Sequence, residues 1–141
     1  MYYQAVKHHI ITILTVAALL RGCSGKQDAI VKAYNSMASA EQAYVTLFKS
    51  ALQTESFQGI KTATNTYLQN VQNIDMSDCP DDFKQAMKRL ESSLNDINVY
   101  LSSINNFDDV DDTRFGPLQD ARLSATVNIG SVAESHGLII Q

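Results

Sequence analysis

Two cysteines and three histidines are the side chains of this 141-residue chain with the most versatile chemistry, and only Cys79 and His136 follow Cys23. Covalent haem attachment requires the sequence Cys-x-x-Cys-His, and neither cysteine has another one nearby. A di-iron centre in a helical bundle requires Glu-x-x-His pairs on facing helices. Glu134 and His136 are two residues apart, so they would lie on different helix faces. We therefore predict no cofactor.

Cys79 immediately precedes Pro80, at a point where we expect a helix to begin, and three aspartates lie close to it in the sequence. A helix N-terminus lowers the pKa of a thiol and makes it reactive, whereas the aspartates oppose the thiolate. We favour a small residue that packs as an apolar side chain. Two alternatives stay open: a reactive, redox-active free thiol and, in an oxidising compartment, a disulfide with Cys23 if that cysteine is unmodified.

Four aspartates, Asp108, Asp109, Asp111 and Asp112, form the densest charge cluster of the chain. Hard cations such as Ca²⁺ take roughly six to eight oxygen ligands, so these are the residues that a metal site here would use. The glycine and the glutamate that an EF-hand loop needs are both missing. We therefore interpret the cluster as a solvated loop that complements the positive end of the next helix, and we predict no metal site.

No arrangement of residues in the sequence predicts a catalytic site, so we do not expect an enzyme. His136 is the one histidine after Cys23 that could act as a general base, and no serine lies in a nucleophile motif. Four tyrosines on or near apolar helix faces could line a ligand groove. We favour core positions with the hydroxyl group at the rim for these residues, which are Tyr34, Tyr44, Tyr67 and Tyr100.

The elements that must position these residues are four amphipathic helices. Apolar residues recur at three- and four-residue steps over 30–52, from about 56 to 71 and over 83–104, and a fourth segment begins near Pro117. Because the connections are short, neighbouring helices must run antiparallel. The sequence predicts an all-α fold: an antiparallel up-down-up-down four-helix bundle over residues 27–141, after an N-terminal signal helix.

The ends of these helices carry signals of their own. Pro80 suits the first turn of the third helix, because that position needs no N–H donor. We expect His136 and Gly137 to form the last turn and the cap of the fourth helix, and the apolar residues 138–140 to fold back on the bundle. The expected buried face of the fourth helix consists of Leu118, Ala121, Ala125, Ile129 and Val132.

The N-terminal segment has the pattern of an export signal. An uncharged, largely apolar run covers residues 10–20, with Lys7 before it and Arg21 after it. As a helix this run would be about 16 Å long, roughly half of a hydrocarbon core, which is too short to span a bilayer. A basic start followed by an apolar run of this length is typical of a signal peptide.

The sequence Leu20-Arg21-Gly22-Cys23 resembles the lipobox of bacterial lipoprotein precursors. In that family an aliphatic residue stands three positions before the cysteine and a small residue directly before it; Arg21 departs from the small residue usual at its own position. The resemblance implies cleavage before Cys23 and lipidation of Cys23. It divides the chain into a signal peptide (1–22), a lipidated tether (23–26) and the bundle domain. A conventional secretory signal or an uncleaved anchor is the alternative.

The net charge of the chain after signal cleavage limits the classes of partner that it could bind. Both basic residues before Cys23 would be removed with a signal peptide, which leaves 9 basic and 15 acidic residues and a net charge of −6. Such a domain repels phosphate backbones, so we expect no nucleic-acid partner.

The expected function is that of a non-enzymatic envelope lipoprotein, a binding or structural module with a protein partner. The resemblance to lipoprotein precursors, with Ser24 directly after the cysteine, implies the periplasmic face of the outer membrane. The alternative is a periplasmic sensor of a small molecule or divalent cation.

Overall fold

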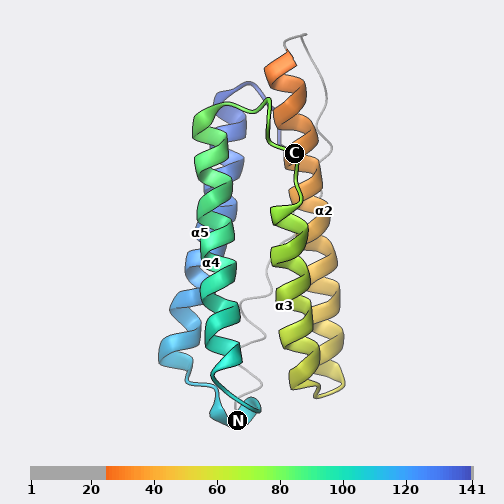
Figure 1. Cartoon of the computed structure of the whole chain (residues 1–141), viewed down its shortest axis with the longest axis vertical. Coiled ribbons are helices and arrows are strands. Elements are labelled where there is room, and N and C mark those ends of the chain that lie inside the picture. The colour runs from red at the N-terminus through yellow and green to blue at the C-terminus, as the bar shows by residue number, and fades with distance from the viewer. Residues whose placement is uncertain (1–24, 141) are drawn as a thin grey trace.

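The computed structural model describes residues 25–140 of the chain as an antiparallel helical bundle (Figure 1). The segment predicted to be an export signal and Cys23, for which lipidation is predicted, lie outside the described residues. The elements follow in the order α2 (Gly25–Gln53), α3 (Phe57–Gln72), α4 (Asp81–Ser102), η1 (Phe107–Asp109) and α5 (Asp112–Ser135). The predicted all-α, up-down bundle is confirmed. Because α2 already begins at Gly25, part of the expected tether is helical.

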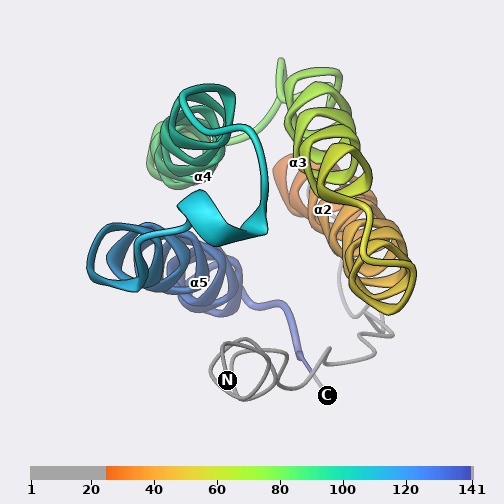
Figure 2. The same ribbon diagram turned by 90° about the horizontal axis from the view of Figure 1, so that it is seen from below.

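The four long helices form two hairpins that pack side by side. The α2–α3 and α4–α5 pairs make the most extensive contacts, α3 packs against α4, and the seam between α2 and α5 is the least extensive. Figure 2 shows this arrangement end-on, with η1 lying across the end of the bundle. No helix within residues 25–140 is long and apolar enough to cross a bilayer.

The core follows the periodicity of the sequence most closely on α4. Burying one large apolar side chain contributes about 1.5–3 kcal/mol to stability, and α4 buries one at nearly every step of three or four residues along a single face. This confirms the face predicted for the third helix. Its fully buried large side chains are Phe83, Met87, Leu90, Leu94, Ile97 and Leu101.

Helices α3 and α4 begin at residues suited to helix starts. The Ser56 hydroxyl accepts a hydrogen bond from the backbone N–H of Gly59 and caps α3. Pro80 takes the N-cap position of α4, one residue before the first turn in which we expected it. Asp81 and Asp82 occupy that turn, where their charges favour the positive end of the helix dipole.

Helix α5 begins earlier than predicted, at Asp112 rather than near Pro117. The Asp111 carboxylate accepts hydrogen bonds from the backbone N–H and the hydroxyl of Thr113, at 2.9 and 2.6 Å, and so caps the helix six residues before the proline. Pro117 therefore lies inside α5, where it removes one backbone donor. The prediction was wrong because the proline was taken as the start signal instead of the aspartate.

The buried face of α5 also differs from the predicted one. Ala125 and Ile129 are buried as expected, Leu118 and Val132 are half-buried, and Ala121 is exposed. The other side chains that point inward belong to two polar residues and one small one. These are Gln119, Arg122 and Ala133.

The C-terminal end of α5 is closed as the sequence predicts. His136 is the C-cap and Gly137 follows with φ +90°, a conformation that glycine adopts without strain. The Gly137 N–H donates to the Glu134 carbonyl and the Leu138 N–H donates to the Ala133 carbonyl, which together form a Schellman motif. Leu138 is buried and Ile140 packs against the core, so the tail folds back on the bundle as predicted.

Gly59 lets α3 approach α2 closely, and this gives a prediction about stability. A Cβ atom at position 59 would lie 2.8 Å from the Ala51 Cβ. Gly59→Ala should therefore lower the free energy of unfolding by about 1–2 kcal/mol, since the clash exceeds the gain in helix propensity. Urea denaturation measures the change.

Gly130 on α5 is the matched control, because a Cβ there would meet only ordinary contacts, the nearest being Ile140 Cδ1 at 3.5 Å. Gly130→Ala should raise stability by about 0.5–1 kcal/mol. Adding Ala51→Gly to Gly59→Ala should recover part of the loss. Equal effects of the two glycine substitutions would contradict the close-approach argument.

Candidate functional site

A buried ion pair joins α2 to α5 in the interior of the bundle. Arg122 Nη1 lies 3.0 Å from Glu41 Oε1, and the two side chains are 6% and 18% exposed. Arg122 faces inward because it is three residues before Ala125 and seven before Ile129, on the same face of α5. Since a buried charge is costly unless paired, Glu41 is the contact that keeps this guanidinium in the core.

Two further side chains complete the surroundings of the guanidinium group. The Arg122 Nε–H donates to Gln119 Oε1 at 3.2 Å, one turn earlier on α5. The group lies over the Tyr44 ring, with 5.3 Å between its carbon and the ring centroid, which is a cation–π contact. Arg122 thus has an anion, an amide and an aromatic face as partners.

Tyr44 on α2 and Tyr67 on α3 extend the polar cluster to a third helix. Their rings stack with centroids 4.9 Å apart. Burial raises the pKa of Tyr44, although Arg122 acts in the opposite direction. Burial likewise raises the pKa of Tyr67 well above its usual value, and the Glu41 charge adds to the effect. Both phenols therefore stay protonated at neutral pH and can act as hydrogen-bond donors, but not as bases.

Two polar atoms of this cluster have no hydrogen-bond partner among the described residues: the Tyr67 hydroxyl and the Gln119 Nε2 amide nitrogen. The Thr126 hydroxyl, which acts to lower the Tyr67 pKa, donates its hydrogen bond to the Arg122 carbonyl. Leaving a buried donor unsatisfied costs about 1–3 kcal/mol. An internal water molecule or a small polar ligand would gain hydrogen bonds here.

The structure confirms that the four predicted tyrosines lie in the core, but the hydroxyl group of one of them does not lie at the rim as predicted. Tyr34, Tyr44, Tyr67 and Tyr100 are all buried. The Tyr100 hydroxyl lies near the end of the bundle, where it accepts a hydrogen bond from the Asp111 N–H at 2.8 Å. The Tyr67 hydroxyl is enclosed instead of lying at the rim, because its ring stacks on Tyr44 inside the bundle.

Cys79 is buried, as the packing interpretation predicted, and forms no disulfide within the described part of the chain. Burial is the main cause that raises its thiol pKa; Lys84 lowers this pKa and the nearby Asp75 and Asp78 carboxylates raise it. The net shift disfavours the thiolate. This environment argues against a reactive thiol, because the thiolate is the nucleophilic form.

The acidic residues between α4 and α5 cap backbone N–H groups. Asp109 Oδ2 accepts a hydrogen bond from the Asn105 N–H at 3.0 Å. Asp111 caps α5, and its hydrogen bonds from Thr113 lower its pKa. Asp108 and Asp112 are exposed. Across residues 25–140, no three His, Cys, Asp or Glu side chains are arranged to hold a metal ion.

His136 also has a structural partner. Its Nε2 atom lies 2.9 Å from Asp82 Oδ2, which joins the end of α5 to the start of α4. The hydrogen bond with His136 is the main cause that lowers the Asp82 pKa. The contact between His136 and Asp82 joins two helix ends, and it does not direct either side chain at a nucleophile or an enclosed cavity.

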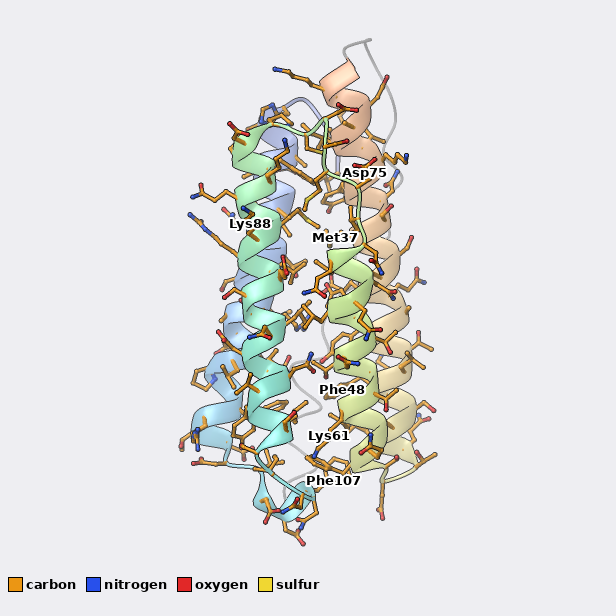
Figure 3. The ribbon with its side chains drawn as sticks, viewed as in Figure 1. Met37, Phe48, Lys61, Asp75, Lys88 and Phe107 are labelled. Atoms are coloured by element: carbon orange, nitrogen blue, oxygen red, sulfur yellow. The ribbon has the colours of Figure 1, made fainter. Side chains whose placement is uncertain are left out.

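A shallow, open groove of about 760 Å³ lies between α2 and α3, near the upper part of the bundle in Figure 3, where Asp75 is labelled. Half of its ten lining residues carry amide or hydroxyl groups, and no aromatic side chain lines it. Its lining residues include Lys32, Asn35, Ser39, Asn70 and Asn73.

Comparison with protein-family models finds no match, and comparisons with curated proteins and with solved structures find none either. The site is therefore interpreted from its own geometry. That geometry describes a polar cluster that ties helices together and that includes two protonated phenols.

Proposed function

We propose that this chain is a non-enzymatic lipoprotein of the bacterial envelope, anchored through Cys23, with the bundle as a binding or structural module for a protein partner. The observation that carries the proposal is the position of the domain. The lipobox-like sequence ends at Cys23, and α2 begins at Gly25. The buried core then draws on residues from Ile30 to Leu138. A compact domain that follows Cys23 this closely in the sequence supports the proposal of a lipid-anchored module.

The buried polar groups support a non-enzymatic role. Arg122 is already paired, and the phenols of Tyr44 and Tyr67 are held in their protonated forms. His136 pairs with Asp82 at the outside of the bundle. Within residues 25–140, these titratable groups make contacts that hold helices together, whereas an active site would direct such groups at a ligand cavity.

The anchor itself should dominate membrane binding. A single acyl chain gives only marginal, reversible attachment, whereas several chains on one residue hold a protein stably on a bilayer. The resemblance to lipoprotein precursors implies acylation at both the sulfur and the new amino group of Cys23. We propose the periplasmic face of the outer membrane as the location, because Ser24 follows the cysteine.

Cys23→Ser tests the proposal. In bacterial cells, the wild-type chain should fractionate with the envelope and incorporate labelled palmitate, whereas Cys23→Ser should lose the palmitate label and leave the membrane fraction. Cys79→Ala is the matched control, because it also removes one thiol and should leave both properties unchanged. Membrane association and acyl labelling that persist in Cys23→Ser would contradict the proposed anchor.

A further inference from the structure

We infer that the bundle stands end-on to the bilayer: the end at which α2 begins lies against the lipid headgroups, with the exposed Ile139 side chain of the C-terminal tail facing them. The opposite end, which η1 covers, points away from the membrane. This inference rests on the proposed lipidation of Cys23, and it names the lipid surface as the partner of one end of the fold.

The length of the tether is the first argument. The described part of α2 starts at Gly25, two positions after Cys23 in the sequence. Two residues of fully extended chain span about 7 Å. The first turn of α2 is therefore held within about one helix diameter of the acylated residue.

The C-terminal tail belongs to this same end. Gln27 Nε2 donates a hydrogen bond to the Gly137 carbonyl at 3.3 Å, which fixes the turn after α5 beside the first turn of α2. Figure 1 shows the tail turning back from the end of α5 along the bundle. The pair between His136 and Asp82 brings the start of α4 to this end as well.

The tail presents an apolar side chain at its surface. Leu138 is buried and holds the tail on the bundle, whereas Ile139 is 52% exposed. The other exposed large aliphatic side chains of the described residues, Leu47, Val99 and Val127, belong to three different helices. They do not form one continuous stripe, so the long sides of the bundle lack the apolar face that side-on binding to a membrane needs.

Charge does not drive this contact. The segment between α3 and α4 lies at the same end and carries Asp75 and Asp78, with Asp81 and Asp82 directly after it. Anionic lipid would repel these carboxylates. It would also repel the domain as a whole, whose net charge is −6. The tether and the apolar tail must therefore hold this end at the surface, and the contact should also form on uncharged lipid.

In this orientation the end of the bundle that η1 covers is accessible to other molecules. Helix α2 has 29 residues, which corresponds to a length of about 43 Å. At the far end, Phe107 of η1 packs edge-on against Phe57, and the Lys61 ammonium donates to the Ile104 carbonyl at 2.8 Å. Figure 3 shows Lys61 and Phe107 close together there. These contacts hold the acidic η1 segment against the end of the bundle. In the proposed orientation this end faces away from the bilayer.

Depth-dependent fluorescence quenching tests the orientation on the full, lipidated chain. The protein is reconstituted on phosphatidylcholine vesicles that contain a lipid with a quencher at the headgroup. A fluorophore is attached to a new cysteine at Ile139→Cys, or at Asp108→Cys as the matched control at the far end. Cys79 is buried and Cys23 is acylated, so labelling of the native protein selects the new thiol.

We expect the label at position 139 to lose most of its emission when the quencher is present, and the label at position 108 to keep its emission. Equal quenching at both positions, or stronger quenching at 108, would overturn the end-on orientation. Each labelled protein is also made with Cys23→Ser. If these variants leave the vesicles while the parents bind without the expected contrast, the anchor stands and only the orientation fails. If the parents do not bind, both proposals fail.

Discussion

Replacing Arg122 with alanine is expected to lower the free energy of unfolding by about 2–4 kcal/mol. Breaking a fully buried ion pair by removing one partner costs about 3–5 kcal/mol, and the value here is smaller because the Glu41 side chain keeps 18% of its surface exposed. The substitution leaves the Glu41 carboxylate without its cation and Gln119 Oε1 without its donor. Urea denaturation at neutral pH, followed by circular dichroism, measures the change.

Two further variants separate the ion pair from a general effect of losing an arginine. Arg89→Ala removes an exposed arginine on α4 and should change stability by less than about 0.5 kcal/mol. The double variant Glu41→Leu/Arg122→Met replaces the pair with apolar side chains and should recover most of the loss. An Arg122→Ala protein as stable as the parent would show that the ion pair contributes little to the association of α2 with α5.

How well the sequence predicts this fold depends on how strongly each helix separates apolar from polar faces. On α4, large apolar residues from Phe83 to Leu101 occupy one face, and nearly every position predicted to be buried is buried. The cap at Gly137 was also predictable, because few residues other than glycine adopt positive φ at a helix end. Strong local preferences were enough in both cases.

Helix α5 could not be predicted equally well, because its buried face is not the most apolar one. Arg122 and Gln119 point inward, and their partners Glu41 and Tyr44 lie some 80 residues earlier on α2. Apolar periodicity places charged residues outside, so it selected Ala121 for the interior instead. One signal was present: Arg122 is in register with Ala125 and Ile129. Recognising it required knowing that a carboxylate faces that position across the bundle.

The same reasoning explains which parts of the candidate site were foreseen. The burial of the four tyrosines follows from their positions on or beside apolar faces, and that of Cys79 follows from the tendency of free cysteine to pack as a small apolar residue. The capping role of Asp111 follows from Thr113 two positions later, a local contact that the charge cluster obscured. The unpartnered Tyr67 hydroxyl depends on ring stacking between α2 and α3. Contacts of that kind are set by how two helices pack, and one sequence read alone does not specify them.

The core of α4 gives the largest expected change from a single apolar substitution. Phe83 is fully buried near the start of α4, so Phe83→Ala should lower the free energy of unfolding by about 3–5 kcal/mol through lost transfer energy and the cavity left behind. A domain of this size has a total stability of roughly 5–15 kcal/mol, so this variant should unfold at much lower urea concentration, as monitored by circular dichroism.

Phe107→Ala makes the same chemical change at a residue that is 37% exposed and packs edge-on against Phe57. It should cost about 1 kcal/mol, because less apolar surface returns to water. If Phe83→Ala does not fold, Phe83→Leu supplies the measurement, since a smaller cavity should cost less than the alanine and still more than Phe107→Ala. Equal losses at positions 83 and 107 would mean that the end covered by η1 is as tightly packed as the core at the start of α4, and that the domain has no weaker end.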